Sequence, residues 1–123
     1  MLTVEELVVL CKEWQAILNI QFWDIKVGIY RGRDFSKKEI QAEVSFQLAT
    51  ATAILRILDP TDYDRDLWPQ DMEVSMVHEL LHLRLAEADE TESGSMEDIL
   101  LERAIDHIAK ALVKLKRGGL NNG

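Results

Sequence analysis

The chain lacks several features that mark special classes of protein. It has one cysteine among 123 residues, so no intrachain disulfide can form, and this favours a reducing compartment. No apolar run approaches the ~20 residues of a membrane-spanning helix, and no cationic stretch precedes an apolar one as in a secretory leader. Acidic side chains outnumber basic ones by 22 to 14, whereas nucleic-acid surfaces are basic. We therefore expect a cytoplasmic protein that binds neither nucleic acid nor a membrane.

Histidine is also scarce, and two of the three histidines lie in the motif His78-Glu79-Leu80-Leu81-His82. On a helix, residues four apart project to the same side, so both imidazoles can reach one zinc ion. Glu79, next to the first histidine, can then deprotonate a water that the metal activates. The alternative is a buried helix whose histidines are satisfied by neighbouring carbonyls or carboxylates. We interpret the motif as a zinc site.

The surrounding residues predict that this motif lies on a helix from Asp71 to Ala88. Apolar residues recur at core spacing, at Val74, Val77, Leu81 and Leu85. The two histidines project beside this apolar face and should point inward. A charged stripe falls on roughly the opposite side, at Glu73, Arg84 and Glu87.

Other local signals predict a single α+β domain over residues 1–117, followed by a disordered tail at 118–123. Thr3 and Glu6 form a capping box for a helix that runs to about Leu18. Alternating patterns predict three strands, of which the second and third form a hairpin beside the first, at residues 25–30, 42–47 and 51–58. Ser95 begins a last helix that continues to about Arg117. Loops are expected at residues 31–39, 59–69 and 87–94.

The helical faces also predict which side of each terminal helix is buried. The first helix should bury Leu7, Leu10, Cys11, Trp14, Ile17 and Leu18. In the last helix, the inward side carries Ile99, Ile105, Ala109, Leu112 and Val113. Its solvent side carries Arg103, His107, Lys110 and Lys114, which removes His107 as a candidate ligand.

Two carboxylates of the last helix fall within its inward arc, Glu102 and Asp106. Carboxylates directed at a core are costly unless they are paired or bound to metal. Because zinc held by two histidines needs a third protein ligand, Glu102 is our candidate, with Asp98 and Glu97 as rivals. Asp106 could accept the second ring N–H of a liganding histidine, in the second coordination shell. The alternative is a helical acidic pair bonded to arginine or to backbone groups.

The motif His78-Glu79-Leu80-Leu81-His82, followed by Glu102 and Asp106, resembles the zincin metallopeptidases of the gluzincin type. The order of a first helix, a small three-stranded sheet, a motif helix and a glutamate helix is similar to the minimal zincin core. A compact chain of this kind is similar to small phage- or prophage-encoded zincin-like proteins. The resemblance implies a Zn²⁺-dependent peptidase, with an Asp four residues after the glutamate that supports a histidine.

Our leading hypothesis is a zinc-dependent peptide-bond hydrolase acting on a peptide or protein substrate. His78, His82 and Glu102 would hold the metal, and Glu79 would act as general base on a metal-activated water. An extended substrate could add to an exposed edge of the sheet. Two alternatives remain: a non-catalytic zincin-like module stabilised by metal that binds another protein, and a metal-free domain in which the histidines merely pack.

Overall fold

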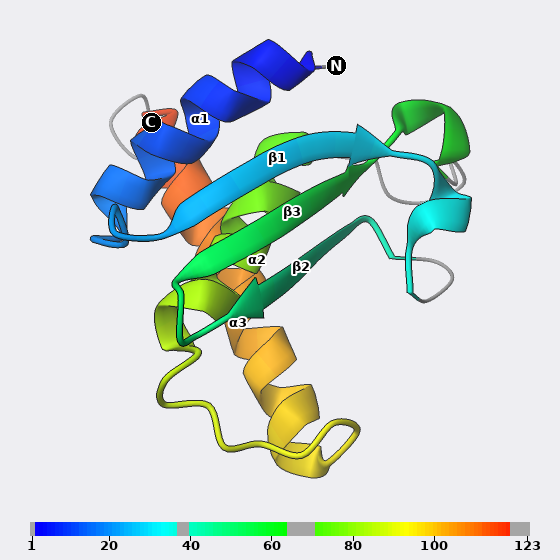
Figure 1. Cartoon of the computed structure of the whole chain (residues 1–123). Coiled ribbons are helices and arrows are strands. Elements are labelled where there is room, and N and C mark those ends of the chain that lie inside the picture. The colour runs from blue at the N-terminus through cyan, green and yellow to red at the C-terminus, as the bar shows by residue number, and fades with distance from the viewer. Residues whose placement is uncertain (1, 37–39, 64–70, 119–123) are drawn as a thin grey trace.

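The fold has a small sheet covered on one face by helices (Figure 1). The computed structural model describes residues 2–36, 40–63 and 71–118. Along the chain the elements are α1 (Val4–Ile17), β1 (Asp24–Tyr30), β2 (Ala42–Gln47), β3 (Thr52–Leu58), α2 (Met72–Leu85) and α3 (Met96–Lys116), with short 3-10 helices at Gly32–Asp34 and Pro60–Asp62. Helices α1 and α2 pack on the sheet, and α3 packs on α2. The predicted α+β class is confirmed.

The sheet has the strand order β1-β3-β2, so β3 is central and both other strands are edges. Strands β2 and β3 are antiparallel, with Ala42 opposite Ile57, which confirms the predicted hairpin. Strand β1 runs parallel to β3, with Val27 opposite Leu55. Because side chains alternate along a strand, Ala53, Leu55 and Ile57 all point toward the helices, where they are buried.

Helix α1 begins at the predicted capping box, in which the Thr3 hydroxyl accepts from the Glu6 backbone and the Glu6 carboxylate accepts from the Thr3 backbone. Its buried residues include the predicted Leu7, Cys11 and Trp14. The prediction for Ile17 is wrong, since this residue is 48% exposed. The core lies instead toward Gln15, whose side-chain amide donates to the carbonyls of Ile20 (3.1 Å) and Trp23 (2.8 Å). These bonds fix the turn into β1.

Helix α2 is capped by Asp71, whose carboxylate accepts from the Val74 backbone N–H at 3.1 Å. It ends at Leu85, three residues earlier than predicted, and Leu85 itself is 36% exposed rather than part of the core. Glu73, predicted on the solvent side, is buried. Its carboxylate is paired with cations from the end of α3, and this pairing is the condition under which a buried charge is tolerated.

Helix α3 begins at the predicted N-cap, where the Ser95 hydroxyl accepts from the Asp98 backbone N–H, and it ends at Lys116 with Arg117 as its C-cap, one residue before the predicted end. Ile105, Ala109 and Val113 are buried as predicted. Ile99 is not, because the first turns of α3 project beyond the sheet and α2 (Figure 1), and this side chain is 50% exposed.

Some sequence-based predictions fall on residues outside the described ranges. They concern the end of the predicted first loop at residues 37–39, the connection at 64–70, and residues 119–123 of the predicted tail. The described part of the turn before that connection forms the 3-10 helix Pro60–Asp62. Within the described ranges, no helix combines the length and apolarity that crossing a bilayer requires.

Candidate metal centre

The two motif histidines lie on the side of α2 that faces α3. Met76, Val77 and Leu80 anchor the opposite and lateral sides of α2 in the core, and each of them has no exposed surface. This burial fixes the rotation of the helix about its axis. The side chains of His78 and His82 are 19% and 22% exposed, and their ring centroids lie 5.2 Å apart. They are therefore adjacent and partly open to solvent.

Glu102 of α3 meets both histidines. Its Oε2 lies 3.0 Å from His78 Nε2, and its Oε1 lies 2.6 Å from His82 Nε2. The sequence placed Glu102 on the inward arc of α3, and the structure brings it to the motif. One carboxylate from α3 thus contacts two imidazoles of α2, and its role as a metal ligand stays a prediction.

These distances allow a test of whether a zinc ion would fit. A tetrahedral site with bonds of about 2.1 Å separates its ligand atoms by about 3.4 Å. The two observed separations, 3.0 and 2.6 Å, are shorter, so Glu102 would have to withdraw by less than about 1 Å. Its side chain is 47% exposed and is free to make that movement. Two imidazoles and a carboxylate are also the donor set of many catalytic zinc sites. The residues present fit the ion.

Glu79 lies beside this group but is much less exposed, at 13% for its side chain. Potential ligand atoms of His78, Glu79 and His82 all lie within 4.8 Å of one another. Burial, and then the negative charge of Glu102, raise the pKa of Glu79 to about 8, although a hydrogen bond from the Val44 backbone N–H acts in the opposite direction. Without a cation, Glu79 therefore holds a proton at neutral pH, and a nearby cation would favour its ionised form.

Asp106 lies behind His78, one helical turn after Glu102. Its Oδ1 is 3.6 Å from His78 Nδ1, and its Oδ2 accepts from Lys110 Nζ at 2.8 Å. Burial tends to raise the pKa of Asp106, but the Lys110 and His78 interactions outweigh it and leave the pKa below its usual value. An ionised carboxylate therefore lies near the ring nitrogen of His78 that points away from Glu102, but 3.6 Å exceeds hydrogen-bond distance, so the supporting role of Asp106 stays a prediction.

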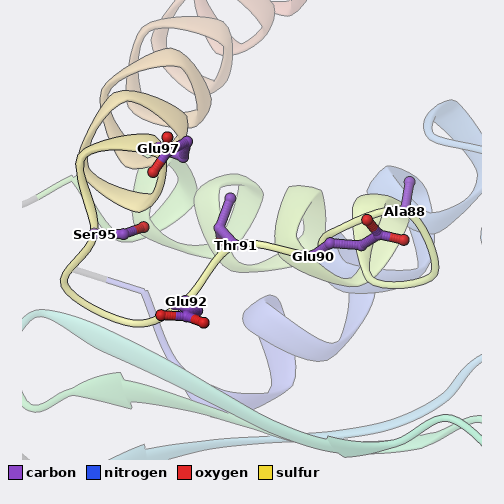
Figure 2. Close-up of a pocket in the computed structure, with 6 residues that line it drawn as sticks. All are labelled: Ala88, Glu90, Thr91, Glu92, Ser95 and Glu97. Atoms are coloured by element: carbon purple, nitrogen blue, oxygen red, sulfur yellow. The ribbon is translucent and has the colours of Figure 1, made fainter.

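The rival ligands are placed elsewhere. Asp98 Oδ2 accepts from the Gly94 backbone N–H at 3.0 Å. Glu97 lies at a pocket where the loop at residues 87–94 meets the first turn of α3 (Figure 2). The lining of this pocket contains no histidine and consists of Ala88, Glu90, Thr91, Glu92, Ser95 and Glu97. His107 is exposed, as predicted.

Sequence reasoning missed two contributors to the site. The Val44 backbone N–H bonds Glu79 from the edge strand β2, and a main-chain group carries no signal in the sequence. Lys110 was predicted on the solvent side, where it lies, but its bond to Asp106 was not foreseen. The i, i+4 spacing of these two residues was the available signal.

Comparisons of the chain with protein-family models, with curated proteins and with solved structures find no match.

Proposed function

We propose that this protein is a zinc-dependent peptide-bond hydrolase with a minimal zincin-like domain of the gluzincin type. The observation that carries the proposal is the contact of Glu102 with the Nε2 atoms of both His78 and His82. The donors come from two helices that pack side by side on a small sheet, which supports the same conclusion. The ligands would be His78, His82 and Glu102.

When bound, zinc would supply Lewis acidity toward a water molecule and the carbonyl of the scissile peptide. The protein's own part in the reaction belongs to Glu79. Its carboxylate takes the proton of the attacking water and passes it to the leaving amine, so the same group serves as base and then as acid. Burial keeps Glu79 oriented, and a bound cation would favour its ionised form, which can accept the proton. Asp106 holds the imidazole of His78 in position from behind.

The substrate would bind as an extended strand along β2. This strand is an edge of the sheet, and an unpaired edge offers backbone N–H and C=O groups to a peptide. The Val44 N–H of β2 bonds Glu79 and so is not available to the peptide, but the bond places this strand directly beside the general base. A peptide added to that edge would have its backbone held next to the reacting groups.

The first experiment measures metal content and activity on protein purified without a metal-binding tag. We expect about one zinc per chain, as in mononuclear sites of this kind. Glu102→Gln should lower zinc affinity at least tenfold, as expected when a ligand is changed, whereas the matched control Glu97→Gln should not. Glu79→Gln should retain zinc but lose the hydrolysis of a fluorescent casein substrate.

The outcomes separate the possible functions. Zinc binding without any hydrolysis that depends on Glu79 would favour the alternative, a non-catalytic protein-interaction module stabilised by metal. Absence of zinc binding, with a melting temperature unchanged by a chelator, would contradict both and leave a metal-free domain. In that domain the Glu102 carboxylate simply satisfies the two imidazoles.

A further inference from the structure

Helix α3 has a second apolar face, separate from the one that packs on α2. Placed at 100° per residue, five apolar residues fall within one arc of about 80°. All five are exposed, and we call them the α3 stripe: Leu100, Ala104, Ile108, Ala111 and Leu115. The three large members are 50%, 45% and 51% exposed. The stripe is roughly 22 Å long at 1.5 Å per residue.

A row of basic side chains follows one side of the stripe. This basic row consists of Arg103, His107, Lys110 and Lys114, all exposed. The charge of this segment is opposite to that of the rest of the chain. Residues 103–117 contain five Lys or Arg and one acidic residue, so their net charge is +4. Because the whole chain has a net charge of −8, the remaining residues together carry −12. Arg103 and Lys114 form no ion pair within the described residues.

We propose that the α3 stripe and its basic row dock an acidic amphipathic helix of another protein. Apolar residues of that helix would cover the stripe, and its carboxylates would pair with Arg103 and Lys114. This is the helix-in-groove mode of recognition, in which apolar anchors recur at helical spacing. Charge complementarity selects the partner, because an acidic flank is the feature that the basic row matches.

A second copy of this chain fits the surface less well. In an antiparallel pair of α3 helices, the two basic rows would face each other and repel. An anionic membrane is also disfavoured, because the rest of the chain is strongly acidic.

The position of the stripe is compatible with the metal centre but does not depend on it. On the same helical projection, Glu102 lies about 160° from the middle of the stripe, on the far side of α3. A partner bound at the stripe would therefore leave the α2–α3 site open.

The test uses the full chain and a synthetic probe, an 18-residue fluorescent peptide with leucines at helical spacing and glutamates beside them. We expect saturable binding by fluorescence anisotropy. Ile108→Glu should weaken it at least tenfold, and so should reversal of both Arg103 and Lys114 to Glu. The matched control is Val9→Glu, at an apolar residue of α1 that is 64% exposed, and it should bind as the wild type does. A peptide with lysine in place of glutamate should bind at least tenfold more weakly.

Several results would overturn the proposal. One is failure of the acidic peptide to bind. Peptide binding that Ile108→Glu leaves unchanged would count equally, provided that circular dichroism shows the variant to be folded. Another is a dimer in sedimentation velocity that Ile108→Glu abolishes, since the occupant would then be a second copy. The third is stripe-dependent binding to phosphatidylserine vesicles in place of the peptide, which would make the occupant a membrane.

Discussion

The substitution Glu79→Gln tests the burial of this carboxyl group through the pH dependence of stability, independently of catalysis. In the metal-free protein, Glu79 is buried beside the negatively charged Glu102, and its pKa is about 8 instead of 4.5. The folded state therefore keeps a proton on this carboxyl group over a pH range in which the unfolded chain has lost it. The glutamine side chain of the variant has the shape of the protonated form at every pH. Relative to this variant, the wild type should lose stability as pH rises from 4.5 through about 8.

The size of the effect follows from the two pKa values. At 1.36 kcal/mol per pH unit, the interval from 4.5 to about 8 corresponds to at most about 5 kcal/mol. At pH 7, which is below the folded-state pKa, the same relation gives a change of about 3 kcal/mol in the free energy of unfolding. Some water reaches the site, because the neighbouring histidines are about one-fifth exposed, so we expect about 2–4 kcal/mol between pH 5 and pH 8.

The measurement is urea unfolding of both proteins at several pH values in the presence of a chelator. Other titrating groups are common to the two chains and cancel in the difference. Glu87→Gln, at an exposed residue after α2, is the control and should show a difference that does not vary with pH. If the difference for Glu79→Gln stays constant between pH 5 and pH 8, the burial argument is refuted. Saturating zinc should reduce the difference, because a cation stabilises the ionised carboxylate.

Two further changes test how the fold is held together. Glu73→Ala removes a buried carboxylate that accepts from the Trp14 indole N–H and pairs with Lys116 and Arg117, so the indole N–H loses its acceptor and each cation loses one partner. We expect the free energy of unfolding in urea to fall by about 3 kcal/mol. The exposed Glu92→Ala should cost less than about 0.5 kcal/mol, and equal losses would contradict a structural role for Glu73. Gly28→Ala places a Cβ 2.8 Å from Cε1 of Tyr30 and should cost about 1 kcal/mol as the ring moves aside. Gly32→Ala, whose Cβ would meet only ordinary contacts, should be nearly neutral, and the reverse ranking would argue against a close approach at the first site.

The parts of the fold that could be predicted depend on neighbours in sequence. The capping box of Thr3 and Glu6 and the N-cap Ser95 fix helix starts within a few residues, and both are found where the sequence indicates them. Strand alternation is equally local, and it identifies the residues of β3 that face the core. The hairpin followed from the short connection between its strands. The parallel pairing of β1 with β3 was not predicted, because a hairpin beside the first strand can pair with it through either of its two strands.

Errors arose where burial depends on a partner far along the chain. Glu73 looks like a surface residue because its own helix gives no sign of Trp14, whose Nε1 donates to the carboxylate, or of Lys116 and Arg117 at the other end of the chain. Gln15 was overlooked for the same reason, since its acceptors are carbonyls of a turn that follows α1. Helical periodicity gives the direction of a side chain, but it does not identify the group that will meet it.

The candidate site combines both situations, and this affects what a metal could do there. The spacing of His78 and His82 is local, whereas their contact with Glu102 depends on how α3 lies against α2. The packing of α3 on α2 is also stabilised by ion pairs of Glu73 in α2 with Lys116 and Arg117 at the end of α3. Together with the buried apolar residues of α3, these ion pairs hold the helix in place from the opposite end and involve no metal ligand. A zinc ion would therefore bind to groups that are already assembled, and its contribution would fall mainly on the chemistry of the site rather than on the fold.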